Sequence, residues 1–451
     1  MLNDPRDAKD PFVQCALALW DTANTKRESA YADATKLRDE LRLTGNHQAF
    51  GWATATCGRI AAYRGEIDAA EALLTEALGR FMLVNDVYGR MIVTSHLAIP
   101  QTLRGNLARC IELALEPFQS GVSFNPRDLA LLHNVAALCH HEREEFHAAL
   151  FQLNSEYSIL KRYGDTERLP GLVSNIGVLL IHVGEFELAL ASVSKAWNLE
   201  KARCNDENEL QLIYLSHIIC ANCQLDRIDT AGEHADELMR YLKKRKDVEV
   251  PCYVFDNLAE VFARLGQVGL ARQFFRRAQL QSVGNQTPRI RGMLVSTEAQ
   301  LAEATGNYRQ AIDLAQQAIG SPDTRIPDVV RRAAASIIGR CYAKLGDQKT
   351  AKYWVQYRKD VGRENLLSDI LSEQIRTNFR IADPKVKLTE QELNCLRLSA
   401  NGQTSSDIGL KLGIKPRTVN FHFSKILRKL NAMNRQEAIA KAANANLLNL
   451  R

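Results

Sequence analysis

A glycine turn followed five residues later by a small side chain recurs about every 40 residues through residues 1–358. The clearest copies have their turns at Gly65, Gly184, Gly266, Gly306 and Gly346. Weaker copies have theirs at Thr25, Gly105, Glu144 and Asp226. A fixed period of this length is typical of repeat architectures, in which one small unit stacks on the next. The pattern therefore predicts an all-α chain whose main part is a superhelical solenoid of about nine helical hairpins.

Each unit has an apolar-periodic segment on both sides of its turn, which predicts two helices. Small residues stand where those helices must approach closely, namely Ala70, Ala189, Ala271, Ala311 and Ala351. A second small residue follows seven positions later at Ala77, Ala196, Ala278 and Ala318. This pattern resembles the tetratricopeptide repeat, whose usual period is about 34 residues. The resemblance implies longer helices or loops than usual and a concave face that binds partners.

The resemblance also implies which residues line that face. Nine positions before the turn, the family places a groove-facing side chain, and here those positions hold Asn134 (with one residue inserted), Asn175, His217, Asn257 and Thr297. Asparagine offers both a donor and an acceptor, so a ladder of such residues can hold the backbone of an extended peptide. Two positions before their turns, His182, Arg264 and Lys344 are expected to add charge to the same face. The alternative is that these are ordinary surface polar groups or caps between repeats.

The charge of the chain changes sharply towards its C-terminal end. Residues 385–451 contain twelve Lys or Arg and four Asp or Glu, whereas the whole chain has a net charge of only +6. A small basic domain indicates a polyanionic partner. Between the two parts, residues 359–385 are predicted to form a capping helix to about Phe379 and a linker broken at Asp383–Pro384.

Residues 386–451 carry start and stop signals for four short helices. Thr389-x-x-Glu392 is a capping box, Gly402 and Gly413 are stops, Thr404 is a cap and Pro416 suits a first turn. The third helix has an apolar stripe of Val419, Phe423, Ile426, Leu427 and Leu430. The fourth helix is expected from Asn434 to about Leu448. Two short helices around a tight turn, the second one basic, form a helix-turn-helix.

This tail resembles the LuxR-type DNA-binding domain through "LTEQELNCLRLSANG", "RTVNFH" and "ILRKLNAMNRQEAI". The resemblance implies a bacterial transcription factor that binds double-stranded DNA as a homodimer through the fourth helix, with RNA polymerase as a further candidate partner. The repeats leave no room for the acyl-homoserine-lactone domain of the quorum-sensing branch. Lys415 departs from the Ser or Thr cap that the family often has there.

Several side chains are expected to contact DNA. In the family, the positions of Asn420 and Ser424 read base edges, and Phe421 is placed to touch a thymine methyl group. Contacts to phosphates are expected from the remaining set, which is Thr404, Lys415, Arg417, Thr418, Lys425, Arg428 and Lys429. The alternative is a basic face that is merely solvated.

Other groups of reactive residues indicate no chemistry. Cys220-x-x-Cys223 with His217 nearby invites a metal or redox interpretation, but a zinc site usually needs a second pair of ligands, and buried cysteines explain the spacing equally well. The pair His140-His141, with His147, is expected to face solvent. We therefore expect no enzymatic activity, no metal and no cofactor.

The beginning of the chain, "MLNDPRDAKDPF", lacks the basic and apolar pattern of a signal peptide. The longest uncharged runs have 16 residues and contain polar groups, which is too short for a membrane span. Ten cysteines without a framework fit a reducing compartment. A cytoplasmic protein without membrane contact is expected.

The preferred hypothesis is a regulator whose solenoid (residues 1–358) senses a signal and whose tail (residues 386–451) binds DNA. An extended peptide or a protein segment is the expected signal, and a small molecule between repeats is the alternative. A second hypothesis is an adaptor or anti-activator that acts mainly through its solenoid. On the ladder hypothesis, Ala at both Asn175 and Asn257 abolishes the response to the signal.

Overall fold

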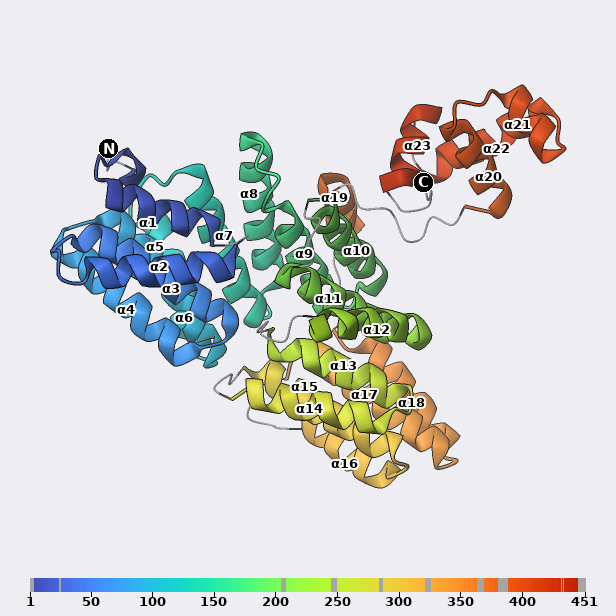
Figure 1. Cartoon of the computed structure of the whole chain (residues 1–451). Helices are drawn as coiled ribbons and strands as arrows, with labels where there is room; N and C mark the ends of the chain where they lie inside the picture. Colours follow the sequence, from blue (N-terminus) through green and yellow to red (C-terminus); the bar gives the residue numbers. More distant parts are fainter. Residues whose placement is uncertain are drawn as a thin grey trace.

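The computed structural model describes residues 4–23, 26–203, 208–244, 250–283, 287–320, 326–362, 369–379, 388–430, 432 and 434–444. Within these ranges the chain is entirely helical and contains no strand. A short 3-10 helix, η1 (Pro5–Asp7), precedes the first α-helix. Figure 1 shows the solenoid curving from the N-terminal helices in blue to α18 in orange, and the C-terminal domain in red.

Eighteen helices form nine consecutive hairpins, which confirms the predicted number of repeats in the described part of the chain. They are α1 (Pro11–Thr22), α2 (Arg27–Leu41), α3 (His47–Arg64), α4 (Ile67–Leu83), α5 (Val87–Leu103), α6 (Leu107–Gln119), α7 (Pro126–Glu142), α8 (Phe146–Tyr163), α9 (Leu169–Val183), α10 (Phe186–Arg203), α11 (Glu209–Gln224), α12 (Ile228–Lys244), α13 (Cys252–Arg264), α14 (Val268–Gln281), α15 (Pro288–Ala304), α16 (Tyr308–Ile319), α17 (Asp328–Lys344) and α18 (Gln348–Asp360).

The turns between paired helices use the left-handed backbone region. The glycines predicted at the turns have φ between 74° and 93°. Glu144 and Asp226, which replace glycine in the weaker copies, also have positive φ, at 60° and 63°. A side chain in this region costs energy, so the turn geometry is kept even where glycine is absent. Thr25, the predicted turn of the first unit, lies outside the described residues.

The small residues predicted between paired helices are buried. Ala70, Ala189, Ala271 and Ala311 have no exposed surface, and Ala351 is 5% exposed. The second set, Ala77, Ala196, Ala278 and Ala318, is also buried. Methyl groups at these positions let the helix axes approach, and the larger apolar side chains around them form nearly continuous core clusters.

Polar contacts connect repeats that are far apart in the chain, which the prediction of an open concave face did not include. Arg289 on α15 forms an ion pair with Glu142 on α7, with 2.8 Å between Nη2 and Oε1. The backbone N–H of Asp328 donates to Glu144 at 3.2 Å, and Arg332 donates to the carbonyl of His182. Arg27 on α2 pairs with Glu209 on α11 at 2.6 Å. We call these the cross-solenoid contacts. They close the superhelix around its inner face.

Helix α19 (Asp369–Phe379) forms within the predicted connector, but it does not lie on the end of the last hairpin. Ile375 is fully buried in a core cluster with residues of α8 to α11, and Figure 1 shows α19 beside α9 and α10. The helix expected in this connector thus covers the middle of the solenoid instead of its last hairpin. The predicted break at Asp383–Pro384 lies outside the described residues.

The C-terminal domain consists of α20 (Glu390–Ala400), α21 (Ser405–Leu412), α22 (Pro416–Lys429) and α23 (Arg435–Asn444). Its predicted local signals are confirmed: Thr389 and Glu392 form a capping box, and Gly402 and Gly413 adopt φ of 77° and 66°. Thr404 forms a second capping box with Asp407. The predicted end of the fourth helix near Leu448 lies outside the described residues. Among the helices described, none is long and apolar enough to cross a bilayer.

Candidate DNA-binding surface and ligand cavity

Helix α22 presents an apolar face to the core of the C-terminal domain. Val419, Phe423 and Ile426 are buried, and they pack with Ile408 of α21 and Ala438 of α23. Leu427 and Leu430 are partly buried against the same cluster. The stripe predicted from the sequence therefore fixes which side of α22 faces outwards.

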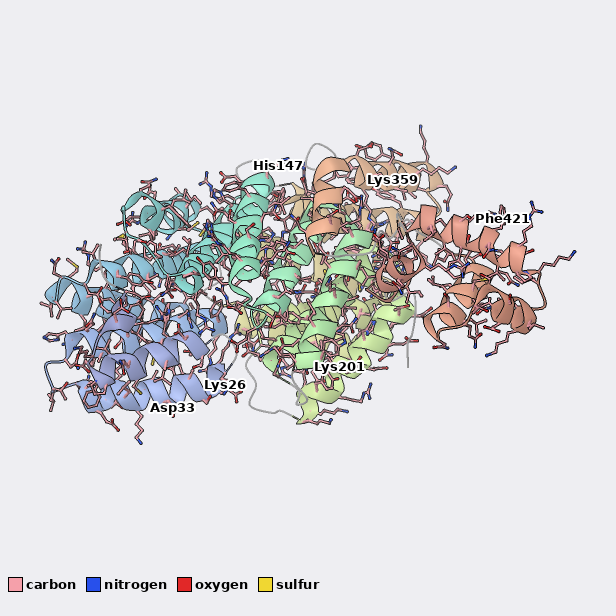
Figure 2. All side chains as sticks on the ribbon, turned by 90° about the horizontal axis from the view of Figure 1, so that it is seen from above. Lys26, Asp33, His147, Lys201, Lys359 and Phe421 are labelled. Carbon is pink, nitrogen blue, oxygen red and sulfur yellow. The ribbon has the colours of Figure 1, made fainter. Side chains whose placement is uncertain are left out.

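The outward side of α22 is basic and carries one large apolar side chain. Lys415, Arg417, Asn420 and Ser424 are exposed, and Thr418 and Lys425 are half-buried. Phe421 is 57% exposed at the surface of this domain (Figure 2). The ammonium of Lys425 lies 4.5 Å from the centre of the Phe421 ring. A helix of this kind has the width and the side chains needed to enter the major groove.

Asn420 is held by the rest of the domain. Its Oδ1 accepts hydrogen bonds from Ser405 Oγ at 2.8 Å and from Arg435 Nη2 at 2.6 Å. Because a guanidinium only donates, the atom facing Arg435 must be the amide oxygen. The NH₂ group of Asn420 is then the end available for a base, and it would pair with acceptors such as guanine O6 or thymine O4.

Other predicted DNA contacts are engaged inside the domain. Lys429 Nζ donates to Glu392 Oε2 at 2.6 Å, so this lysine stabilises the packing of α22 on α20. Burial acts to raise the pKa of Glu392, but the hydrogen bonds from Lys429 and Thr389 outweigh it and lower that pKa. The hydroxyl of Thr404 donates to Asp407 at 2.6 Å, and Ser424 Oγ donates to the carbonyl of Asn420. The side chain of Arg428 lies outside the described residues.

A cavity of about 460 Å³ lies on the inner face of the solenoid. Its lining comes mainly from the first helix of each hairpin, from α3 to α17, and includes Arg27, Glu142 and Arg289 of the cross-solenoid contacts. Five of the six predicted groove residues line this one cavity, and they are Asn134, Asn175, His217, Asn257 and Thr297. Arg264 and Lys344 do not line it. The guanidinium of Arg264 donates instead to the carbonyl of Cys223 at 2.8 Å and pairs with Asp226.

The asparagines do not form a uniform ladder. Asn257 is buried, and its amide donates to the backbone carbonyl and the hydroxyl of Ser216. The amide of Asn134 donates to Glu156 at 2.9 Å. Asn175 is exposed in the cavity and has no hydrogen-bond partner in the described part of the chain. Asn175 is therefore the one of the three asparagines whose amide can bind a ligand without losing an existing hydrogen bond.

Histidines in the cavity wall are neutral. Burial and the charge of Arg289 lower the pKa of His217 to about 4, and burial lowers the pKa of His141 to about 4 as well. His141 hydrogen-bonds to His182, and their rings stack with centres 4.2 Å apart. The prediction that His140 and His141 face solvent was wrong, because the last turn of α7, which contains both, lies against α9. His140 is also buried and bonded to Glu145 at 2.7 Å.

Arg289 and Glu142 are functional candidates that the sequence did not reveal. Burial acts to raise the pKa of Glu142, but the neighbouring charge of Arg289 lowers it below its usual value. Both residues line the cavity. A signal was present in that Arg289 directly follows the proline at the start of α15, where a basic residue is unusual, but only the cross-solenoid contact explains it.

The Cys220-x-x-Cys223 pair lies on one side of α11. Burial raises the pKa of both thiols, which keeps them protonated. In the described ranges, no three His, Cys, Asp or Glu side chains come together as a metal site requires.

Residues 386–442 match the family model described as "Bacterial regulatory proteins, luxR family". The transcriptional activator protein AhyR of Aeromonas hydrophila is 42% identical over 74 residues, which are 16% of this chain and 28% of AhyR. SolR of Ralstonia solanacearum is 32% identical over 106 residues, 24% of this chain and 41% of SolR. The chain thus spans about a quarter to two fifths of these relatives.

The solenoid is similar in fold to a Rap protein solved as a complex with Competence and Sporulation Factor. The structural alignment covers 81% of this chain and 99% of the Rap chain, with a TM-score of 0.50 and 9% sequence identity. The described part of this chain is thus a tetratricopeptide-like solenoid followed by a LuxR-type helix-turn-helix domain.

Proposed function

We propose that this chain is a bacterial transcription regulator in which a signal bound inside the solenoid controls promoter binding by the C-terminal domain. The exposed basic side of α22, fixed by its buried apolar stripe, is the observation that carries the proposal. The relatives that share this domain are named as transcriptional activators. Such a protein acts in the cytoplasm, where bacterial DNA lies, and it binds ligands instead of catalysing a reaction.

The proposed signal is a short peptide or the end of a protein segment. A cavity of about 460 Å³ falls in the range that suits small ligands. A peptide extended along all nine repeats does not fit an inner face that the cross-solenoid contacts cross. The Rap protein of similar fold is complexed with Competence and Sporulation Factor. A small molecule is the second candidate, and the cavity volume suits it equally well.

The active form is proposed to be a dimer on DNA. One domain with a single recognition helix contacts only a half-site, so a second copy is needed to span two half-sites one helical turn apart. Helix α23 is the proposed interface, as the LuxR resemblance implies. RNA polymerase is a further proposed partner.

The decisive experiment measures duplex binding by the full chain. Fragments of genomic DNA are selected with and without cell extract, and the selected duplex is then titrated at several salt concentrations by fluorescence anisotropy. Affinity should fall steeply as salt rises, because several phosphates are neutralised. Absence of sequence-selective binding in every condition would favour the adaptor hypothesis. Equal affinity for one half-site and for a palindrome would contradict the dimer.

A further inference from the structure

The wall of the cavity formed by α13 and α15 contains buried acceptors without partners. Asp256 is 1% exposed and Gln300 is 5% exposed, and both line the cavity. Asp256 Oδ1 and Gln300 Oε1 accept no hydrogen bond from any described residue. An unpaired buried acceptor costs free energy, so two of them facing one cavity indicate a missing donor.

A second carboxylate lies one helical turn beyond Asp256. Glu260 lines the same cavity, and the amide nitrogen of Gln300 donates to its Oε1 at 3.3 Å. This contact turns the Gln300 oxygen away from Glu260 and leaves it as an acceptor. Burial, and next the charge of Glu260, raise the pKa of Asp256 to about 7, and the hydroxyl of Thr297 offsets this only in part. The carboxyl of Asp256 therefore has no cation to compensate its charge.

The cations near this wall are engaged elsewhere. Arg340, whose charge acts on Glu260, donates to both oxygens of Glu303 at 2.8 and 2.7 Å. Arg358 also acts on Glu260, but its Nη2 donates to the carbonyl of Gln224 at 2.7 Å. Arg289 is paired with Glu142. None of these arginines donates to Asp256 in the described structure.

We propose that Asp256, Glu260 and Gln300 bind a positively charged nitrogen group of the ligand, an ammonium or a guanidinium. Such a group only donates hydrogen bonds, and the unpartnered atoms of this wall, Asp256 Oδ1 and Gln300 Oε1, are both acceptors. Its charge would compensate the two carboxylates in a site that water reaches poorly. The inference rests on the proposed function in that it describes the ligand of the same cavity. It gives that ligand a basic residue or a free amino terminus.

The test compares two small probes that differ in charge alone. N-acetyl-arginine amide carries a guanidinium, and N-acetyl-citrulline amide has a neutral urea of nearly the same shape. Binding of each to the full chain is measured by ligand-detected NMR and by calorimetry. The arginine probe should bind at least tenfold more tightly than the citrulline probe. This preference should vanish in the double variant Asp256→Asn and Glu260→Gln, and remain in the control Glu298→Gln, which removes an exposed carboxylate from α15.

Circular dichroism verifies that each variant is folded, and the single variant Glu260→Gln, at a half-buried position, replaces the double variant if that one is not. Equal binding of the two probes, no binding of the arginine probe, or an unchanged preference in the double variant would overturn the proposal. Promoter binding by the full chain is scored separately. A chain that prefers the cation but never binds DNA would refute the proposed function and leave the cation site supported.

Discussion

Replacing Arg289 by Met should destabilise the solenoid far more than an ordinary loss of a surface charge. The side chain of Glu142 is only 5% exposed, so removal of its partner leaves a buried carboxylate. Breaking such a pair costs about 3–5 kcal/mol of unfolding free energy. Protonation of Glu142 sets an upper bound on this cost. Holding that glutamic acid neutral at pH 7.5, against an ordinary pKa of about 4.3, costs about 4 kcal/mol. The two figures agree.

The pH dependence of this loss is also determined. In the wild type the pKa of Glu142 is lowered, so the pair contributes stability above the ordinary pKa and loses it as pH falls through the folded one. In the variant the lone carboxyl has a raised pKa, and its penalty grows from about pH 4 upwards. The difference between the two proteins should therefore be largest at pH 7.5 and small at pH 4.5. His141, the other titratable neighbour of Glu142, has a pKa lowered to about 4 and is therefore neutral over most of this range.

Urea denaturation followed by far-UV circular dichroism measures the effect at both pH values. The double variant Arg289→Met with Glu142→Gln removes both charges and should recover most of the lost stability. As a matched control, Arg109→Met breaks an exposed pair with Glu112 and should cost less than about 0.5 kcal/mol. A loss that does not depend on pH, or a double variant as unstable as the single one, would refute the reasoning.

Three further changes test other features. Asp256→Asn should stabilise the chain by about 2–4 kcal/mol at pH 8 and by little at pH 4. The reason is that the pKa of Asp256, raised to about 7, penalises the folded state increasingly between these pH values. Thermal melts at both pH values measure the effect, and an effect of equal size at both would contradict the raised pKa. Gly306→Ala, at φ 80°, should lower the stability of the chain by about 1–2 kcal/mol, whereas Gly79→Ala inside α4 should raise it by about 0.5–1 kcal/mol. Both new methyl groups enter open space, but only Gly306 is in a left-handed turn. Equal shifts of the melting temperature would show that backbone strain is not the cause. Arg417→Ala should lower the slope of log affinity against log salt for duplex DNA by about 1. Lys429→Ala should leave that slope unchanged and lower the stability of the domain, because Lys429 is bonded to Glu392. A slope that changes with Lys429→Ala and not with Arg417→Ala would place Lys429 on the phosphates.

The repeat architecture could be predicted because it depends on local signals. The period, the glycine turns and the alanines at the helix contacts are all readable within one unit, and so are the caps at Thr389 and Thr404. Turns without glycine at Glu144 and Asp226 were also found, since the period alone identified them. These features need no knowledge of contacts between distant residues.

The features that were missed depend on contacts between different helices, some of them many repeats apart. Glu142 and Arg289 are unremarkable in their own helices, and the period predicts only contacts between neighbouring units. His141 was assigned to solvent for another reason: α7 and α9 belong to neighbouring hairpins, but the period does not specify which side of α7 faces α9. The engagement of Asn257 with Ser216 was not predicted because both residues are polar and either could have faced the groove. The Lys429 contact to Glu392 joins two helices whose relative rotation the sequence does not specify.

The cross-solenoid contacts also change how the protein should fold and unfold. In an open solenoid each unit depends only on its neighbours, so stability is a sum of local terms and the ends can unravel independently. Here the fourth hairpin is joined to the eighth and the ninth, and the fifth to the ninth, so chain segments 147 to 184 residues apart must meet before the inner face is complete. Contacts of such sequence separation slow folding. They also link distant hairpins into one cooperative unit, so that loosening the C-terminal repeats should weaken the middle of the chain as well.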